Sequence, residues 1–564
     1  MQTKKVMNKI KIWAFALPAF LGSLCSCDND FVKINTDTGT VLEVDPVTML
    51  YQAESKYNTY QSMWDDSYAC KLRWMQYCTG IWGYGTTNFT FFNSRIGQTL
   101  YTEYNDVGSY TKHIEYLVSQ LPEEEAAQYQ DLIQVGRIIL IAKGIATTDM
   151  HGSLVYSEGW GMRSGDTELT EPRFQTQEEL FDLWNQELKE AASALQAQLG
   201  SNQVSLKGYD VCYDGDMEKW IKTANAIRMR IALRIYKRKP AEAKAIAGEV
   251  LASSAIPSST DDSFIMYFDK LFTSGGDWHS VIDMDRASAP FMNYLKKYND
   301  PRKRLFFQIN NLTPENIAAY NAEQTDPDKC IPEDFTRWEG GTVSNDYKST
   351  DKRYLARSIK ADGTDMRAAN KPQTRLWKGM QDDGNGGSWF PILTYADFCF
   401  MASEFVLDGV PSSKTAQQWY EEGVRSSIRQ WSEIGDYCKI NDYEAVSEDE
   451  IEAFMEQEGI RWNPALAKEQ IYCQAYVEYF KNNNETWAMW RRTGYPNQHS
   501  TVITFDPVMI NKVEQDVPRR TRFSYPAVGS PNYQNAVERI ETMAKDPEFG
   551  DITNEFGRLW WDKK

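Results

Sequence analysis

Histidine and closely paired cysteine, the usual ligands of transition metals in proteins, are scarce in this sequence. Its 564 residues include only four histidines, dispersed at His113, His151, His279 and His499. Apart from Cys25 and Cys27, the cysteines are scattered and show no zinc-type spacing. Cys70 and Cys78 would lie ~12 Å apart on a helix, too far for a disulfide. We therefore expect no metal site, and buried apolar thiols rather than a disulfide framework.

Catalytic signatures are absent as well. The sequence contains no HExxH motif, no GxSxG nucleophile elbow, no P-loop and no GxGxxG. Asp382, Asp383 and Asn385 form a loose oxygen cluster without the rest of a calcium-binding loop. A pair of glycosidase carboxylates is not excluded, because 79 acidic residues offer many pairs, but nothing singles out two of them. We predict a protein that is not an enzyme and carries no cofactor.

Positive charge is also in short supply, since the formal net charge is −18 at pH 7. Loss of residues 1–26, which hold four lysines and no acid, would make the chain more negative still. Such a surface repels phosphate backbones, so nucleic acid is excluded as a partner. The composition, 42% hydrophobic and 13% aromatic, is ample for a large core.

One short apolar run, residues 12–24, follows a lysine-rich N-terminus. Thirteen helical residues reach only about 20 Å, short of the ~30 Å hydrocarbon core, as in a secretory signal peptide. The sequence Leu24–Cys25–Ser26–Cys27 resembles a bacterial lipobox, with cleavage before Cys27 and a lipid on its sulfur. The alternative is an ordinary signal peptide with a coincidental cysteine. We predict a signal peptide over 1–26 and a lipidated, flexible tether over 27–45, the latter spanning roughly 25 Å.

Helical patterns dominate the chain from Pro46 to about residue 255. Glutamates 123–125 load the first turn of an expected helix, Thr176 and Glu179 match a capping box, and Asp216 is the expected N-cap of a helix over 220–237. That last helix carries four cations that either serve carboxylates elsewhere or are solvated: Arg228, Arg230, Arg234 and Lys237.

A pair of helices marks the return of the pattern after residue 392. The first is expected over 395–407, and Ser412 or Ser413 is expected to cap the second. Together they fill roughly the 34 residues of a tetratricopeptide-type hairpin. Between the helical regions, residues 256–391 are rich in Gly, Asp, Asn and Pro, and so long a loop-rich stretch indicates function. We predict a mainly α fold in one domain, 46–564, with a helical scaffold over about 46–255 and 392–564.

Many short motifs in this order resemble the SusD/RagB outer-membrane lipoproteins, in the branch with an RRTGYP signature. The segment Glu485–Pro496 (ETWAMWRRTGYP) is the strongest match. Further matching segments follow the family order: Phe31, Ile34–Thr36, Asp45–Pro46, Leu50, Thr148–Glu158, Lys219–Asn225, Arg228–Ala232, Asn299–Arg302, Leu393–Asp397, Pro518–Arg520, Tyr525–Pro526 and Asn532–Tyr533. Val155 stands where the family usually has proline, which bears on loop details.

The resemblance implies a tetratricopeptide-like scaffold with a loop-rich, ligand-facing half. It also implies an outer-membrane lipoprotein that caps a SusC-like TonB-dependent transporter and hands it a nutrient, typically a glycan. Asp28 and Asp30, beside the lipid, resemble the surface-export signal of such lipoproteins, so we expect the protein to face the cell exterior. Oligopeptides are the alternative ligand, as in relatives of the RagB type, and a surface glycoside hydrolase is a third reading.

Aromatic residues in glycine-rich stretches are the candidates for sugar binding, because the apolar faces of sugar rings stack on flat rings. Two stretches offer them, residues 80–88 and 275–279, and a third ring follows Gly386–Gly387. The candidate ligand-binding residues are Trp82, Tyr84, Asn88, Trp278 and Trp389. The alternative is that each Trp fills the core beneath a loop. By contrast, Glu485, Trp487, Trp490, Arg491 and Arg492 are interpreted as structural, with packed indoles and guanidiniums paired to buried carboxylates.

Overall fold

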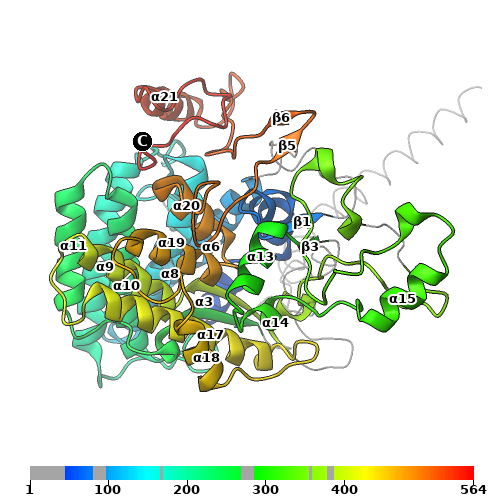
Figure 1. Cartoon of the computed structure of the whole chain (residues 1–564). Helices are drawn as coiled ribbons and strands as arrows, with labels where there is room; N and C mark the ends of the chain where they lie inside the picture. The colour runs from blue at the N-terminus through cyan, green and yellow to red at the C-terminus, as the bar shows by residue number, and fades with distance from the viewer. Residues whose placement is uncertain (1–44, 81–96, 165–168, 269–284, 355–358, 378–385) are drawn as a thin grey trace, which may run out of the picture. The chain divides into compact units, whose positions relative to one another are not determined.

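The computed structural model describes residues 45–80, 97–164, 169–268, 285–354, 359–377 and 386–564 (Figure 1). Residues 49–564 form one compact unit, and residues 45–48 belong to a separate unit with the N-terminal residues. The predicted signal peptide, Cys27 and nearly all of the predicted tether lie outside the described residues.

The N-terminal half is built from helices that pack on their neighbours in sequence. Helix α6 packs on α8, α8 on α9, α9 on α10, and α10 on α11. Their bounds, with those of the smaller helices, are α3 Pro46–Ser55, α4 Tyr60–Ser62, a π-helical segment Met63–Lys71, α5 Leu72–Trp74, α6 Gln98–Ser119, α7 Glu123–Ala126, α8 Gln130–His151, α9 Gln177–Gln198, α10 Met217–Ile235 and α11 Pro240–Ala252.

Local capping chemistry sets several of these helix starts. Thr176 and Glu179 form the predicted capping box of α9, and the Asp216 carboxylate accepts from two amides of α10. The helix expected to run on from Glu123 is instead divided, because the 3₁₀ turn Ala127–Tyr129 separates α7 from α8.

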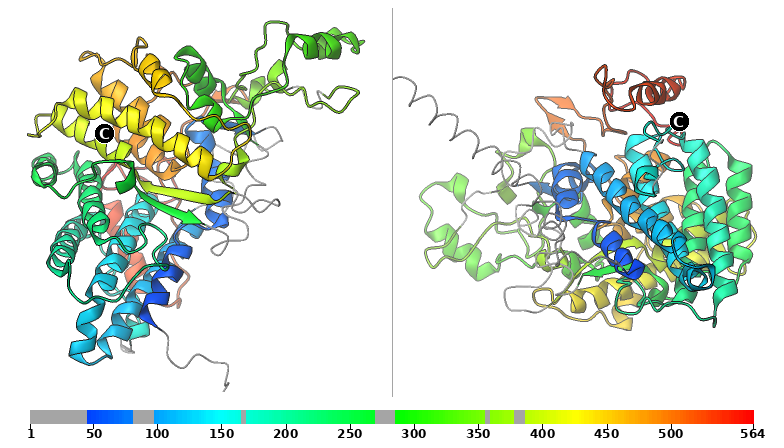
Figure 2. Two further views of the ribbon diagram at one scale, coloured as in Figure 1. Left: turned by 90° about the horizontal axis from the view of Figure 1, so that it is seen from below. Right: turned by 180° about the vertical axis from the view of Figure 1, so that it is seen from behind.

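The C-terminal half repeats the arrangement. Its helices are α16 Tyr395–Leu407, α17 Ala416–Tyr437, α18 Glu448–Met455, α19 Ala467–Glu478, α20 Asn483–Thr493 and α21 Tyr533–Ala544. Helix α16 packs on both α17 and α19, and Figure 2 shows the yellow pair α16 and α17 beside the green and cyan helices of the N-terminal half. The prediction that Ser412 or Ser413 caps α17 is wrong. Thr415 is the cap, and the Ser412 hydroxyl instead accepts from the Trp419 indole.

Residues 256–391 contain short elements joined by loops. The helices here are α13 Ala289–Lys297, α14 Lys303–Phe306 and α15 Pro314–Ala322, which the sequence pattern did not indicate. Strand β1 (Cys78–Gly80) pairs antiparallel with β3 (Asp285–Ala287), and β2 (Phe264–Phe268) pairs antiparallel with β4 (Ser388–Leu393). Further along the chain, β5 (Met509–Ile510) and β6 (Val513–Glu514) form a small hairpin.

An aromatic core joins these parts. Tyr77 stacks on Tyr476 of α19 with ring centroids 4.3 Å apart, and the edge of Phe291 from α13 contacts both rings. Phe306 of α14 meets Trp431 of α17 edge to face at 4.7 Å. The cysteines of the described residues are free thiols, and all but the half-buried Cys330 are buried, as predicted.

The mainly α fold class, with paired helices as scaffold, is confirmed. Among the described residues, none of the helices is both long enough and apolar enough to cross a bilayer.

Candidate functional site

Two small strand pairings involve the described residues that flank the predicted binding residues in the chain. Strand β1 ends at Gly80, which pairs with Asp285. Strand β2 ends at Phe268, which pairs with Ser388. Trp82, Tyr84, Asn88 and Trp278 themselves lie outside the described residues.

A buried ion pair lies next to the pairing of β1 with β3. The Arg73 guanidinium contacts the Asp285 carboxylate at 3.0 Å, and both side chains are almost fully buried. A Cβ at Gly80 would come within 2.8 Å of Arg73 Nη2, so a larger residue there would require the guanidinium to shift. Lys348 Nζ donates to the Gly80 carbonyl at 2.8 Å. The Arg73–Asp285 ion pair and the Lys348 hydrogen bond therefore both hold the end of strand β1 in place.

Trp389, the remaining predicted binding residue, is packed in the core. Its side chain is 1% exposed, and its ring meets Trp431 edge to face at 5.0 Å. The Lys481 ammonium lies 5.4 Å from the ring and donates to the Trp389 carbonyl. In this conformation Trp389 offers no ring face to a ligand, and it supports strand β4 from inside, as the packing alternative expected.

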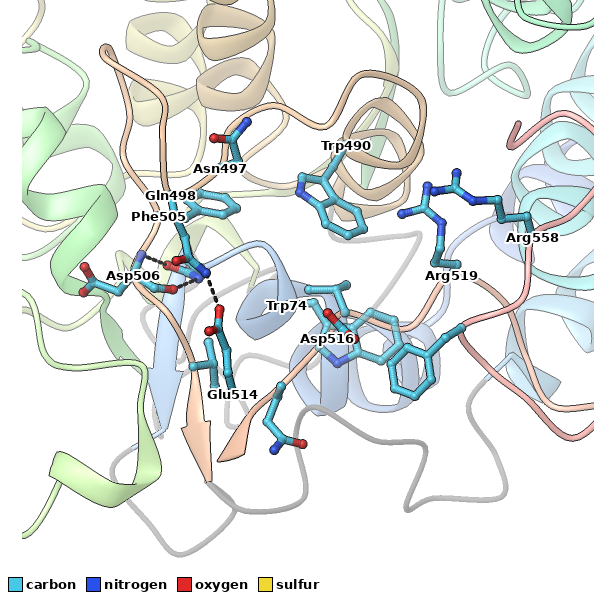
Figure 3. A pocket seen from close by; sticks show the side chains of 15 residues that line it. Trp74, Trp490, Asn497, Gln498, Phe505, Asp506, Glu514, Asp516, Arg519 and Arg558 are labelled. Carbon is cyan, nitrogen blue, oxygen red and sulfur yellow. Dashed lines mark hydrogen bonds between the residues drawn. The ribbon is translucent and has the colours of Figure 1, made fainter. Parts of the chain in front are cut away.

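A cavity of about 340 Å³ opens where α20, the β5–β6 hairpin and the C-terminal residues meet, and we call it the Trp490 pocket (Figure 3). Two of its residues, Trp74 and Gln76, lie just before strand β1. The lining residues are Trp74, Gln76, Trp490, Asn497, Gln498, Phe505, Asp506, Val508, Glu514, Gln515, Asp516, Val517, Arg519, Phe556 and Arg558.

The indole of Trp490 forms one wall of this pocket. In Figure 3 the ring lies between Glu514 on one side and Arg519 on the other. The side chain is half-buried, and its N–H has no hydrogen-bond partner among the described residues. The Arg519 guanidinium lies 5.2 Å from the ring centroid. An aromatic ring of this kind can stack against a sugar ring, and its unused N–H can donate to a sugar hydroxyl.

The hairpin β5–β6 supplies the opposite, acidic wall. Its turn residues Asn511 and Lys512 adopt left-handed backbone conformations, and both amides donate to the Asp346 carboxylate, at 2.8 and 2.6 Å. The Glu514 carboxylate accepts from the Gln498 amide, while the exposed Asp516 has no side-chain partner among the described residues.

The cations of the pocket are already paired. Arg519 and Arg558 both bind the buried Asp562, at 2.6 and 2.9 Å. Partial burial raises the pKa of Asp506, whose backbone exchanges two hydrogen bonds with the Gln76 side chain. The pocket therefore offers an indole, amides and carboxylate oxygens, which suit the hydroxyl, N–H or ammonium donors of a ligand.

The inner side of α20 has the structural role expected from sequence. Glu485 contacts Arg234 at 2.8 Å, and Arg234 also binds Asp149 at 2.9 Å. Burial alone would raise the pKa of Glu485, but Arg230 and Arg234 outweigh it and hold that pKa below its usual range. Arg492 binds Glu404 with an Nη2–Oε2 distance of 2.7 Å. Of the cations left open by the sequence pattern, Arg228, Arg230 and Arg234 all bind carboxylates.

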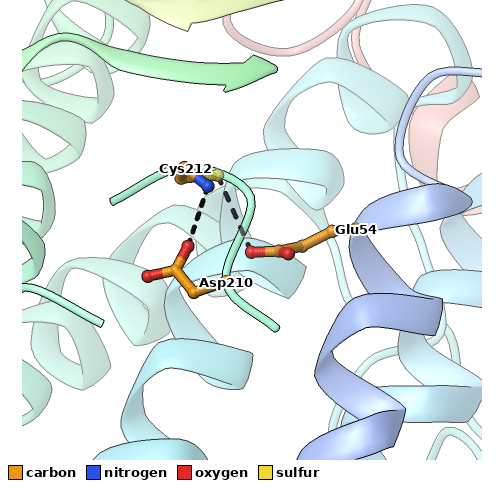
Figure 4. A group of neighbouring side chains, drawn as sticks. All are labelled: Glu54, Asp210 and Cys212. Atoms are coloured by element: carbon orange, nitrogen blue, oxygen red, sulfur yellow. Dashed lines mark hydrogen bonds between the residues drawn. The ribbon is translucent and has the colours of Figure 1, made fainter. Parts of the chain in front are cut away.

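Among the described residues, one group of three potential metal ligands lies close together, namely Glu54, Asp210 and Cys212 (Figure 4). The Asp210 carboxylate already accepts from three backbone amides and the Trp220 indole. Burial, reinforced by the charge of Asp210, raises the pKa of Glu54 well above its usual range. The hydrogen bonds of Asp210 therefore anchor the turn before α10.

A family model described as starch-binding and associating with the outer membrane matches residues 39–526. The chain therefore belongs to the SusD-like family, as the sequence motifs indicated.

Solved structures agree on the fold. A chitin-binding protein is 21% identical, with 92% of this chain and 100% of that chain covered and a TM-score of 0.69. A chitin-binding SusD homologue from Flavobacterium johnsoniae is 19% identical, covering 92% and 98%, with a TM-score of 0.62. A SusD homologue from Bacteroides fragilis is 17% identical, covering 92% and 100%, with a TM-score of 0.65. A search of curated proteins returns no match.

Proposed function

We propose that this chain is a non-catalytic, cell-surface lipoprotein that binds a nutrient oligosaccharide and passes it to a SusC-like TonB-dependent transporter. The observation that carries the binding role is the Trp490 pocket. Its half-buried indole suits the apolar face of a sugar ring, and its polar side chains suit the hydroxyl groups at the ring edge. Family membership supports the glycan, since the family is described as starch-binding and two related structures are described as chitin-binding.

The residues on the flanking segments complete this proposal. Trp82, Tyr84, Asn88 and Trp278 contact the ligand from segments 81–96 and 269–284. Their support is that the described residues next to them in the chain, Gly80 and Asp285, pair with each other, and that Gly80 follows Trp74 and Gln76 of the pocket by only a few residues. Trp389 contributes from beneath by holding β4 in place.

A binding screen tests the ligand class. Calorimetry on the chain lacking residues 1–27 would compare neutral oligosaccharides, N-acetylated oligosaccharides and short peptides. We expect saccharide binding that Trp490→Ala weakens at least tenfold, about 1.4 kcal/mol, because one indole supplies most of the stacking surface. Tyr525→Ala removes an exposed aromatic ring that does not line the pocket, and should leave binding unchanged.

Two outcomes of the screen would overturn the proposal. Binding of peptides but no saccharide would assign the chain to peptide uptake. Release of new reducing ends from a bound saccharide would show hydrolysis, and the pocket carboxylates Asp506, Glu514 and Asp516 would then be the first residues to replace.

The membrane roles need tests in cells. We expect the lipidated chain to co-purify with a TonB-dependent transporter from mildly solubilised outer membranes, and Cys27→Ala to release it from the membrane. Protease added to whole cells digests a surface-exposed chain, and replacing Asp28 and Asp30 with Ala protects it. Unchanged digestion of that variant would contradict the export role of the two acids.

A further inference from the structure

A second cavity, of about 260 Å³, lies between helices α14 and α18, and we call it the Lys303 pocket. It shares no lining residue with the Trp490 pocket. Aromatic rings of Tyr298, Trp338 and Phe454 contribute to its walls, and amides of Asn299 and Gln457 line it as well. Its walls therefore combine flat apolar faces with polar groups.

Nearly every charge around this cavity is paired. Arg304 binds Glu450 through both arms of its guanidinium, at 2.8 and 3.0 Å. Asp300 is bound by the Arg302 guanidinium at 3.0 and 2.7 Å, and it also accepts from the Tyr294 hydroxyl. Within each pair the two charges neutralise each other. Glu450 and Asp300 are therefore already occupied by guanidinium groups.

Lys303 is the exception. Its side chain is half-buried and has neither a hydrogen bond nor an ion pair among the described residues. The ammonium lies 5.2 Å from the centroid of the Trp338 ring. Burial lowers the pKa of Lys303, because water is removed from the ammonium and the charge of Asp300 only partly offsets this loss. A bound anion would restore the lost stabilisation of this charge.

We propose that the Lys303 pocket binds the carboxylate of an acidic sugar residue, with the Lys303 ammonium as the counter-ion and Trp338 as the ring contact. A singly charged carboxylate matches the single unpaired ammonium of Lys303, since the neighbouring guanidinium of Arg304 is already occupied by Glu450. The preference for a carboxylate follows from the pocket alone, whereas the saccharide class rests on the proposed function.

The chain as a whole repels anions, since its net charge is −18. Affinity for an acidic sugar therefore requires a local positive site, and screening by salt weakens the long-range repulsion. The measurement belongs at about 0.15 M salt, where the Debye length is about 8 Å.

A matched pair of ligands tests the charge preference. Calorimetry with a galacturonic acid disaccharide and with its methyl ester compares the same sugar rings with and without charge. We expect the free acid to bind at least tenfold more tightly than the ester. Equal affinity of the two would overturn the proposal.

A matched pair of variants tests the residue. Lys303→Met keeps the length of the side chain and removes its charge, and should abolish the preference for the free acid. Lys297→Met makes the same charge change at an exposed residue six positions earlier that does not line the pocket, and should preserve the preference. Equal effects of the two variants would overturn the assignment to Lys303, and thermal unfolding would verify that both are folded.

The outcomes also separate this inference from the proposed function. Neutral oligosaccharide bound through Trp490, with no preference for the uronate, would sustain the function and overturn the inference. Uronate binding that needs Lys303 but persists in Trp490→Ala would confirm a second site. A peptide carboxylate that binds as tightly as the uronate, with the same dependence on Lys303, would overturn the saccharide class.

Discussion

Helix α20 separates a closed region from an open one, and the two are built from the same residue types. On its inner side, Trp487 is 1% exposed, donates its indole N–H to the Pro518 carbonyl at 2.8 Å and has the Arg491 guanidinium 3.5 Å from its ring centroid. On its outer side, Trp490 is half-buried, lines a cavity and leaves its N–H unused. Three helical positions differ by only about 60° around the axis.

Carboxylates show the same contrast. Glu485 is buried between Arg230 and Arg234, at 3.4 and 2.8 Å, whereas Glu514 at the pocket is exposed and accepts from one amide. The comparison teaches that a residue type does not reveal its role here. On the inner side, Trp487 and Glu485 are bonded to other groups of the protein, whereas on the outer side the Trp490 N–H and the Asp516 carboxylate have no side-chain partner among the described residues.

The largest expected effect is the loss of stability when a buried charge on the inner side of α20 is removed. Glu485→Ala leaves two buried guanidiniums without their shared partner, so the free energy of unfolding should fall by about 3–5 kcal/mol. Urea denaturation followed by circular dichroism measures it. Glu514→Ala, the matched change at the pocket, should stay within about 0.5 kcal/mol. Similar losses for the two variants would abolish the distinction between the regions.

The two tryptophans of α20 give the next test. Trp487→Ala creates a cavity in the core and should cost about 3–5 kcal/mol of unfolding free energy. Trp490→Ala should cost less than about 1 kcal/mol, because solvent already reaches the ring, while it removes ligand affinity. If Trp490→Ala were as destabilising as Trp487→Ala, the outer indole would be a packing residue and the pocket would lose its platform.

A structural feature could be predicted from the sequence where the residues that form it lie close together in the chain. The capping box of Thr176 and Glu179 spans four residues, so the sequence alone indicated it. The cap of α17 could not be chosen among neighbouring hydroxyls, because Ser412 is engaged by Trp419 in a tertiary contact. The partners Arg234 and Glu485 are separated by 251 positions, and no pattern along the chain indicates such a pairing.

The candidate site was predicted only in part. Glycines beside aromatic residues pointed to segments 80–88 and 275–279, and apart from Gly80 these lie outside the described residues, so that prediction stays a prediction. Trp490 was interpreted as structural, since its spacing from Trp487 matches a packed pair. Only the hairpin at 509–514 and the C-terminal residues, distant in sequence, create the cavity beside it. An unsatisfied indole N–H is a tertiary property and leaves no mark in the sequence.

A pH titration probes the closed region with a smaller effect. Burial, together with the charge of Arg539, lowers the pKa of His151 to about 3, so the folded state keeps this ring neutral. Below about pH 6.5 the unfolded chain binds a proton that the folded chain does not, and stability therefore falls as pH falls toward 3. The slope from this residue is at most about 1.4 kcal/mol per pH unit. His151→Gln should flatten the urea midpoint against pH, and the exposed His499→Gln should not.

The smallest expected effect lies at the rim of the open region. Asp516→Asn keeps the shape of an exposed side chain that has no partner among the described residues, so the melting temperature should not change. Affinity for the saccharide found in the binding screen should fall by about 1 kcal/mol, roughly fivefold, because one acceptor loses its charge. A clear change in melting temperature with unaltered affinity would place Asp516 in the closed region instead.

The ion pair of Arg73 and Asp285 beneath Gly80 has a consequence for engineering. It lies at one end of each of two segments, the one between residues 80 and 97 and the one between residues 268 and 285. Doubling the length of a flexible segment costs only about 0.6 kcal/mol of closure entropy. The same frame could therefore accept segments exchanged from relatives with other ligands, provided that the glycine and the ion pair are retained as the splice points.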